Sequence, residues 1–327
     1  MKFDFLICSE RSGSNLITKL LDNHSKYCGP TPPHLLRVFE PVMFKYGDLN
    51  NSENWNAFVN DIYEFFNCKI GVWKAHLTKE ELLLVKIRTL AEVVKYIYNK
   101  EAKNHNKENV FVKEVRTYNF LPFIKDNFTS SKFIWLVRDP RDMVLSWSKS
   151  PVHRGDIVRA SKIWREDQQK TIELYEKLKH TQTFLLVKYE DLITNQKEVL
   201  NSICDFLDVD FEKSMIEFHK NKMSIANAGK TDNWKNLNKE IIVNNSKKYL
   251  ENFSKEQIQY IEYICQEEMD YFGYEKEYEL LNEYDFKVLK EKLSIQERNE
   301  KPEYQLISED EKLKREKWYA KFLEIQK

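Results

Sequence analysis

The sequence has 327 residues, of which 42% are hydrophobic and 13% aromatic, enough for a large core and not typical of a disordered chain. Lysine plus arginine and aspartate plus glutamate are balanced at 52 each, so no overall charge favours nucleic acid or acidic membranes. No stretch approaches the roughly 18 apolar residues of a membrane span, and the N-terminus shows no signal-peptide pattern. The five scattered cysteines form no CxxC pair, so we expect free thiols and a cytoplasmic protein.

The first predicted element is a buried strand over residues 3–8, which is rich in aromatic and branched side chains. The polar turn "SERSGSN" (9–15) follows it, and apolar residues then recur at helical spacing from 16 to 21. A strand that runs through such a turn into a helix leaves unpaired N–H groups at the helix N-terminus, which favours an anion site. The alternative is that Ser12, Ser14 and Asn15 only cap the helix.

This turn differs from the loop that binds nucleoside triphosphates, which reads G-x-x-x-x-G-K-[ST]. Here Gly13 is followed by Ser14, Asn15 and Leu16, so both the lysine and the magnesium ligand of that loop are missing. Hydrolysis of ATP or GTP is therefore not favoured. The remaining arginine, hydroxyls and amide are suited to a phosphate-like group held without a metal.

Further along the chain, strands and helices alternate as in an α/β protein. Three more buried strands are predicted over 110–115, 132–137 and 183–189, and helices over 81–99, 140–148, 161–178, 197–207 and 254–274. This order predicts a single domain with a central, mostly parallel sheet flanked by helices and a helical C-terminal part. We place that domain at 1–275, with 39–109 as a helical insertion or lid, and expect 276–327 to be a charged, mostly helical extension.

A second anion-binding pattern lies in "FIWLVRDPRDMVLSWS" (133–148). Arg138 ends the predicted strand, and Ser146 follows eight residues later in the next helix. Eight helical residues span about 12 Å, but the turn lets the arginine fold back, so both side chains can hold one phosphate from two sides. The alternative is a weak local ion pair between Arg138 and Asp139.

Four segments resemble a known family and occur in its order: "SERSGSN", "RDPRDMVLS", "VKYEDL" and "NAGKTDNWKN" (227–236). They are similar to the sulfotransferases that use 3′-phosphoadenosine 5′-phosphosulfate (PAPS). The resemblance implies an α/β fold related to nucleotide kinases. It also implies transfer of a sulfuryl group to a hydroxyl, less commonly an amine, of a small or carrier-linked metabolite. The product of the donor would be 3′-phosphoadenosine 5′-phosphate (PAP).

The resemblance also assigns roles to residues. The 5′-phosphosulfate would be bound by Arg11, Ser12, Gly13, Ser14 and Asn15, with Arg11 neutralising charge on the leaving oxygen. Arg138 and Ser146 would bind the 3′-phosphate, with Lys230 as a second cation. Tyr189 would stack near the adenine, although a core tyrosine is the alternative. Many soluble members carry lysine and Thr-Thr where this chain has Arg11 and Ser14-Asn15. Its Arg-Ser-Gly form is similar to tyrosylprotein, bacterial small-molecule and carrier-linked branches.

A general base must take the proton of the acceptor, and His34 in "CGPTPPHLLRVFE" (28–40) is the leading candidate. An imidazole with a pKa near 6.5 is substantially neutral at pH 7. The alternative is a structural histidine, with Glu40 and Glu114 as reserve bases; Glu114 would need a raised pKa. No CxxC or HExxH motif occurs, so no metal is predicted.

Two other functions remain open from the sequence. One is a P-loop-like nucleotide kinase or hydrolase, but the sequence lacks the Gly-Lys-Ser/Thr that this function requires. The other is a catalytically inactive protein that binds a nucleotide with the same fold. The acceptor class is not specified by any motif.

Overall fold

The sheet at the centre of the molecule has five strands, all parallel to their neighbours, in a computed structural model that describes residues 1–327. Its order is β2-β3-β1-β4-β5, with bounds Tyr27–Cys28, Asn109–Lys113, Lys2–Cys8, Phe133–Val137 and Phe184–Lys188. The α/β class and four predicted strands are confirmed, each to within two residues at either end. The two-residue strand β2 was not predicted.

The order of the strands decides where a ligand can bind. The chain passes from β1 to one side of the sheet, forms β2 and β3 there, and then places β4 on the other side of β1. In open parallel sheets, ligands bind outside the carboxyl ends of the strands at such a reversal. The segments that follow β1 and β4, which contain Arg11 and Arg138, meet at this point.

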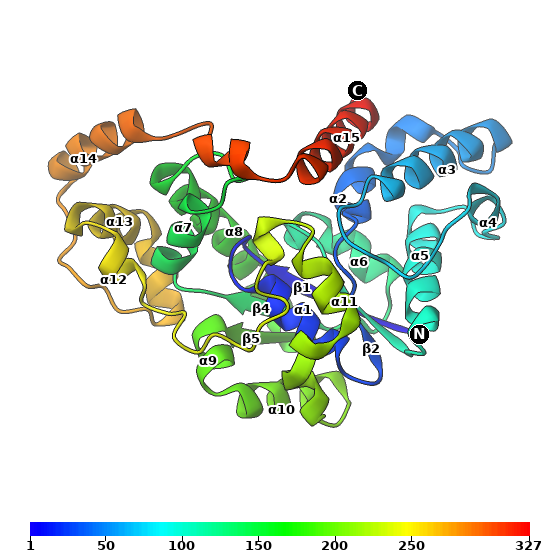
Figure 1. Cartoon of the computed structure of the whole chain (residues 1–327), viewed down its shortest axis with the longest axis horizontal. Coiled ribbons are helices and arrows are strands. Elements are labelled where there is room, and N and C mark those ends of the chain that lie inside the picture. The colour runs from blue at the N-terminus through cyan, green and yellow to red at the C-terminus, as the bar shows by residue number, and fades with distance from the viewer.

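The sheet separates two hydrophobic cores, as the alternation of side chains along β1 requires. Phe3, Phe5 and Ile7 face the larger core, which contains helices α2, α3 and α5 to α8 together with α13. Leu6 and Cys8 face the smaller core, formed with α1, α9 and α10. Both faces are covered (Figure 1), which agrees with the nearly unbroken apolar character of the strands.

The helices of the N-terminal half are α1 (Ser14–Asp22), α2 (Leu35–Phe39), α3 (Ser52–Asn67), α4 (Lys79–Leu83), α5 (Leu90–Asn104), α6 (Leu121–Asn127), α7 (Pro140–Ser148) and α8 (Ile157–Leu178). The later helices are α9 (Tyr189–Thr194), α10 (Gln196–Leu207), α11 (Lys222–Ala228), α12 (Tyr249–Asn252), α13 (Lys255–Phe272), α14 (Glu283–Gln296) and α15 (Glu309–Gln326). No helix combines the length and the apolar character that crossing a membrane requires.

The prediction of one helix over 81–99 was wrong, because two helices occupy this stretch. α4 ends at Leu83, and α5 begins at Leu90 after Thr89, whose side chain accepts a hydrogen bond from the backbone N–H of Glu92. Such a cap starts a new helix. Leu84 and Ile87 between them are exposed, so the run of apolar residues does not form one buried face.

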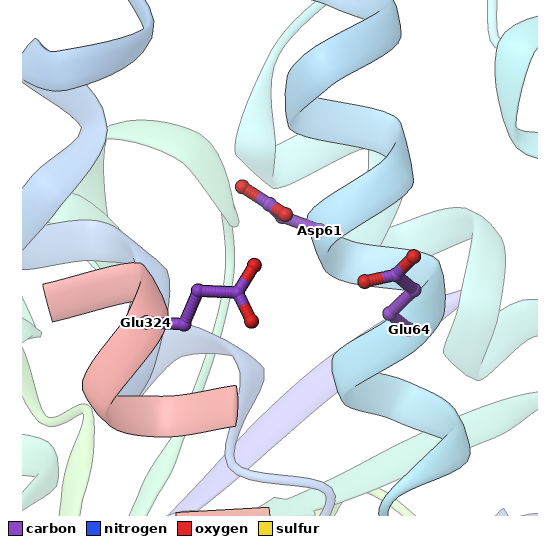
Figure 2. Close-up of side chains that lie close together, drawn as sticks. All are labelled: Asp61, Glu64 and Glu324. Atoms are coloured by element: carbon purple, nitrogen blue, oxygen red, sulfur yellow. The ribbon is translucent and has the colours of Figure 1, made fainter. Parts of the chain in front are cut away.

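The C-terminal residues cross over the body of the molecule as α14 and α15, orange and red in Figure 1. α15 packs against α2 and α3. Asp61 and Glu64 of α3 and Glu324 of α15 point toward one another (Figure 2), with ligand atoms within 4.8 Å, as a metal site would need. The ammonium of Lys321 lies 3.0, 2.6 and 2.9 Å from these three carboxylates. The lysine thus supplies the positive charge, and the cluster fastens α15 to α3.

We expect Lys321→Met to lower the free energy of unfolding by about 1–3 kcal/mol, because three carboxylates lose their shared charged donor. Chemical denaturation measures this change, and proteolysis of the segment that precedes α15 should accelerate. Lys317→Met on the same helix is the control, since Lys317 is exposed and makes no ion pair. Equal effects of the two substitutions would contradict a fastening role.

Candidate functional site

The turn after β1 has the backbone of an anion site. Arg11 and Gly13 have positive φ angles of 67° and 91°, on either side of Ser12, and α1 begins directly afterwards. Alternating backbone conformations of this kind turn successive N–H groups into one concave surface. No side chain caps α1, so the alternative that Ser12, Ser14 and Asn15 serve as caps is not supported. The N–H groups of the first turn of α1 are therefore available to donate hydrogen bonds to a ligand.

Gly13 is required at its position for two reasons. Its φ of 91° is strained for any residue with a side chain, and a Cβ there would lie 2.3 Å from Cδ2 of Tyr189. Tyr189 begins α9 directly after β5, so its ring packs against the turn. The ring therefore forms one side of the site, as well as part of the smaller core.

Arg11 and Arg138 reach the site from different strands. Arg11 donates from Nε to Ser146 Oγ at 3.2 Å and from Nη1 to Asn233 Oδ1 at 2.7 Å. Arg138 donates from Nη1 to the carbonyl of Arg11 at 3.1 Å, and its guanidinium lies 4.4 Å from the centre of the Tyr189 ring. Arg138 thus reaches back to the first turn, while Ser146 is contacted by Arg11.

A cavity of about 170 Å³ lies between these groups. Of the residues predicted to bind the donor, seven line it: Arg11, Gly13, Ser14, Asn15, Arg138, Ser146 and Tyr189. The rest of its wall comes mainly from the segment 233–245, including Asn233, Trp234 and Asn245. Asn245 donates to the hydroxyl of Tyr189 at 2.7 Å, and its carbonyl accepts from Arg138 at 3.0 Å.

Lys230 is not among the lining residues. It lies near Asp310 of α15, whose pKa is lowered mainly by its hydrogen bond with Lys314 and further by Lys230. The "NAGKTDNWKN" segment does reach the cavity, but through Asn233, Trp234 and Asn236. Motif similarity located the segment and did not determine which of its side chains faces the site.

Sequence reasoning missed a further cation, Lys113. It is the last residue of β3, is buried, and donates a hydrogen bond to the side chain of Asn15 in the phosphate turn. The sequence could have indicated this residue, because ligands bind at the carboxyl ends of parallel strands and Lys113 lies at the end of a predicted buried strand. Glu114 follows it immediately, one residue beyond the strand.

The electrostatics of the turn favour a bound anion. Burial, followed by repulsion from Arg138, lowers the pKa of Arg11 to about 10. Burial also lowers the pKa of Lys113 to about 8, and Arg11 adds to this effect. Positive groups that are desolvated and repel one another are stabilised when a negative ligand binds between them.

Behind Arg11, a polar network joins three segments. Glu10 accepts from His153 Nε2 at 2.9 Å, and Ser150 lies 2.7 Å from His153 Nδ1 and 2.9 Å from Asn233. Burial opposes ionisation of Glu10, but His153 outweighs it, with help from Arg37 and His34, and the pKa falls to about 2. The network holds together the turn after β1, the segment after α7 and the segment 233–245, called the late loop below.

His34 lies beside Glu114, the reserve candidate. His34 Nδ1 is 3.4 Å from Glu114 Oε2, and neither oxygen of this fully buried carboxylate has a hydrogen-bond partner. The ring of Trp318 in α15 packs edge-on against His34, with centroids 6.1 Å apart. Glu40, the other reserve, forms no hydrogen bond or ion pair with any of these side chains, and burial raises its pKa. An unpaired buried carboxylate beside an imidazole can hold or orient a proton.

Comparisons with known proteins agree with this architecture. Residues 5–213 match a protein family described as the sulfotransferase family. The sulfotransferase domain of the olefin synthase from Synechococcus PCC 7002 is 20% identical, with a TM-score of 0.54 over 90% of this chain and 94% of that one. This likeness shows the shared fold.

Two other solved structures are less similar. A sulfotransferase domain from the curacin biosynthetic pathway is 17% identical, with a TM-score of 0.49, and the alignment covers 90% of this chain and 97% of that one. Mouse sulfotransferase SULT7A1, solved with PAP, is 12% identical over 90% of this chain and 89% of that one, with a TM-score of 0.46. No curated protein matches the chain.

A parallel α/β sheet with a cationic cavity at its strand reversal defines a class of proteins that bind phosphate-like groups. The family match spans more than half of the sequence. The chain therefore belongs to the sulfotransferase family, and the protein is a sulfotransferase enzyme. The family predicted from the four motifs is confirmed.

We expect Gly13→Ala to lower the free energy of unfolding by about 2–4 kcal/mol, because it adds both a left-handed strain and a clash with Tyr189. Gly229→Ala is the matched control: its φ is −85°, and a Cβ there meets nothing within 4 Å. The double variant Gly13→Ala with Tyr189→Ala should retain the strain after the clash is removed. Equal stability of the two single variants in chemical denaturation would refute the requirement for glycine.

Proposed function

We propose that this sulfotransferase uses PAPS as its donor and modifies a hydroxyl, less commonly an amine, of a small or carrier-linked metabolite. The observation that carries the choice of donor is the pair of arginines, Arg11 and Arg138, which come from different strands to one cavity. Arg11 belongs to the turn that would hold the 5′-phosphosulfate. Arg138 with Ser146 supplies a second anion site, as a 3′-phosphate requires and ordinary nucleotides do not.

Unpaired polar groups in the site support the fit. The hydroxyl of Ser12 and Nε of Arg138 are buried without a hydrogen-bond partner in the chain. Because buried polar groups nearly always have partners, Nε of Arg138, which lines the cavity, fits an oxygen of a phosphate or sulfate, whereas Ser12 does not line the cavity. Lys230 is a weaker candidate for the 3′-phosphate than Asn245, since only Asn245 lines the cavity.

When bound, PAPS supplies the sulfuryl group and a phosphate leaving group. Arg11 and Lys113 would hold the negative charge that grows on the leaving oxygen, and the N–H groups of α1 would fix its position. In the transfer, the bond from sulfur to the acceptor oxygen forms as the bond from sulfur to the phosphate oxygen breaks. The acceptor proton passes to the base, and PAP carries away the electron pair.

His34 remains our candidate for the base, and we assign Glu114, whose Oε2 lies 3.4 Å from Nδ1 of His34, as its partner. A neutral imidazole that carries its proton on Nδ1, the nitrogen that faces Glu114, presents Nε2 as the acceptor of a proton. The Glu114 charge would then stabilise the imidazolium. The competing assignment gives the proton directly to Glu114, and the two assignments predict different pH profiles.

Further assignments from the sequence are kept as proposals. Residues 1–275 form the catalytic domain, 39–109 its helical insertion or lid, and 276–327 an extension. Five free cysteines support the reducing cytoplasm as the compartment. The balanced charge supports a small or carrier-linked acceptor over a nucleic acid.

The donor is tested by Arg138→Ala. Loss of a charge-assisted hydrogen bond of roughly 1.5–3 kcal/mol should weaken PAP about 10- to 150-fold, while adenosine 5′-phosphate is little affected. Calorimetric titration of both nucleotides measures the difference. Arg154→Ala, which alters an exposed arginine without a side-chain partner, is the control. An equal loss for both nucleotides would remove the assignment, and stabilisation by ATP but not PAP would favour a kinase.

The base is tested by His34→Ala and Glu114→Gln. Removal of a general base should lower kcat by about 10² to 10⁴, while PAP affinity stays within a few-fold. The rising limb of the wild-type pH profile should disappear in His34→Ala and persist, at a lower rate, in Glu114→Gln. His180→Ala, at an exposed position, is the control. If only Glu114→Gln removes the limb, Glu114 is the base.

A further inference from the structure

A chain of hydrogen-bond contacts links Glu10 to Arg11 through side chains that the proposed transfer does not use. His153 Nε2 lies 2.9 Å from Glu10 Oε2, and His153 Nδ1 lies 2.7 Å from Ser150 Oγ. Ser150 and Arg11 both donate to Oδ1 of Asn233, at 2.9 and 2.7 Å. Arg11 and Asn233 line the cavity proposed for the donor, so this chain of contacts ends inside the site.

The two ends of the chain of contacts fix the position of every proton in it. A guanidinium has only donors, so Arg11 must face the carbonyl oxygen of the Asn233 amide. The single hydroxyl proton of Ser150 points to that same oxygen, so Ser150 Oγ can only accept from Nδ1 of His153. At the other end, Glu10 is ionised, has only acceptors, and takes the proton of Nε2. Both ring nitrogens therefore carry a proton when every contact is a hydrogen bond.

A neutral His153 leaves one of these contacts without a proton. If the ring proton is on Nε2, Ser150 must turn its hydroxyl to Nδ1, and lone pairs of Ser150 Oγ and Asn233 Oδ1 then face each other at 2.9 Å. If the ring proton is on Nδ1, the lone pair of Nε2 faces the Glu10 carboxylate at 2.9 Å. Either arrangement leaves polar groups unpaired away from water, which is unfavourable. The position of Asn233, and through it that of Arg11, therefore depends on the charge of His153.

The charge of His153 depends in turn on what Arg11 faces. Burial lowers the pKa of His153, and the hydrogen bond with Glu10 raises it. Repulsion from Arg11 and Lys301 lowers the pKa of His153 further. A negative ligand beside Arg11 offsets this repulsion, so it raises the pKa of His153. The other charged and titratable groups around His153 and Glu10 come from the α2 region and the start of α8: His34, Arg37 and Asp156, the last 3.6 Å from Lys301.

We propose that His153 is a positioning residue for Arg11 and that it takes up a proton when the donor binds. This inference rests on the proposed use of PAPS and adds a proton linkage to it. The charged ring orients Ser150 and Asn233, so the guanidinium beside the leaving oxygen is held before transfer begins. Because linkage is reciprocal, the protonated ring favours the donor as much as the donor favours protonation. The gain in affinity is complete below the pKa of His153 in the free protein and is lost as the pH rises through its pKa in the complex.

Calorimetric titration of PAP into the full-length protein, from about pH 6 to about pH 9, tests this linkage. The ratio of the PAP affinity of wild type to that of His153→Gln should fall about tenfold over this range, as expected for a pKa shift of one unit. The ratio is informative because Lys113, with a pKa of about 8, titrates in both proteins. A merely structural loss in His153→Gln would give a constant ratio. His180→Gln, at an exposed position, is the control, and its ratio to wild type should not change with pH.

Proton uptake gives a second readout. Titrations near pH 7 in two buffers of different ionisation enthalpy should show that wild type takes up about half a proton more than His153→Gln when PAP binds. Equal uptake in the two proteins overturns the inference while the donor assignment stands. Failure of wild type to bind PAP overturns the donor assignment and this inference together.

Glu10→Gln removes the need for the extra proton. Its amide can donate to Nε2, so a neutral His153 then satisfies every contact in the chain of contacts. We expect this variant to bind PAP within a few-fold of wild type at high pH and to lose both the extra proton uptake and the tenfold pH effect. Retention of the extra uptake in Glu10→Gln overturns the inference. If His153→Gln fails to fold, this comparison with wild type decides.

Discussion

Three cations, two of them buried and the third half-buried, impose the main constraint on this molecule. Arg11, Lys113 and Arg138 come from the carboxyl ends of three neighbouring strands and lie around the start of one helix. The chain as a whole carries no net charge, so the positive field is made locally. Burial lowers the pKa of Arg11 and of Lys113, with repulsion from Arg138 and from Arg11 respectively as further causes, so a negative ligand between them would be favourable. Much of the surrounding structure serves to hold these charges near one another.

Close packing against the turn after β1 and a network of hydrogen bonds hold these cations in place. The ring of Tyr189 packs on Gly13, the carbonyl of Arg11 accepts from Arg138, and Asn233 accepts from Arg11. Asp142 of α7 accepts from the backbone N–H groups of Lys247 and Tyr249 and so fixes the end of the late loop. Cations that are positioned before a ligand arrives need little reorganisation when charge develops.

Sequence patterns predicted much of the fold, because the strands are buried on both faces and their apolar runs are unambiguous. They failed over 81–99, where a threonine cap divides a continuous apolar run and only the tertiary structure shows which residues are exposed. β2 has two residues, too few for any periodicity.

Within the site, residues fixed by local turn geometry were predictable, as Arg11, Gly13 and Arg138 show. Residues brought in by distant loops were not. Asn245 gave no signal. The orientation of the 227–236 segment depends on contacts with residues 80 positions away, such as that between Thr231 and Glu311. The roles assigned to these residues stay predictions until they are measured.

α15 connects the parts of the molecule that have different tasks. Its Arg315 donates to Thr231 in the segment 227–236, its Trp318 packs against His34, and its Lys321 pairs with Asp61 of α3. The Trp318 ring occupies one side of the imidazole, so α15 bounds the surroundings of His34 on that side. Two elements far apart in the sequence, α2 and α15, thereby set the surroundings of a single side chain, His34, which lies at the start of α2.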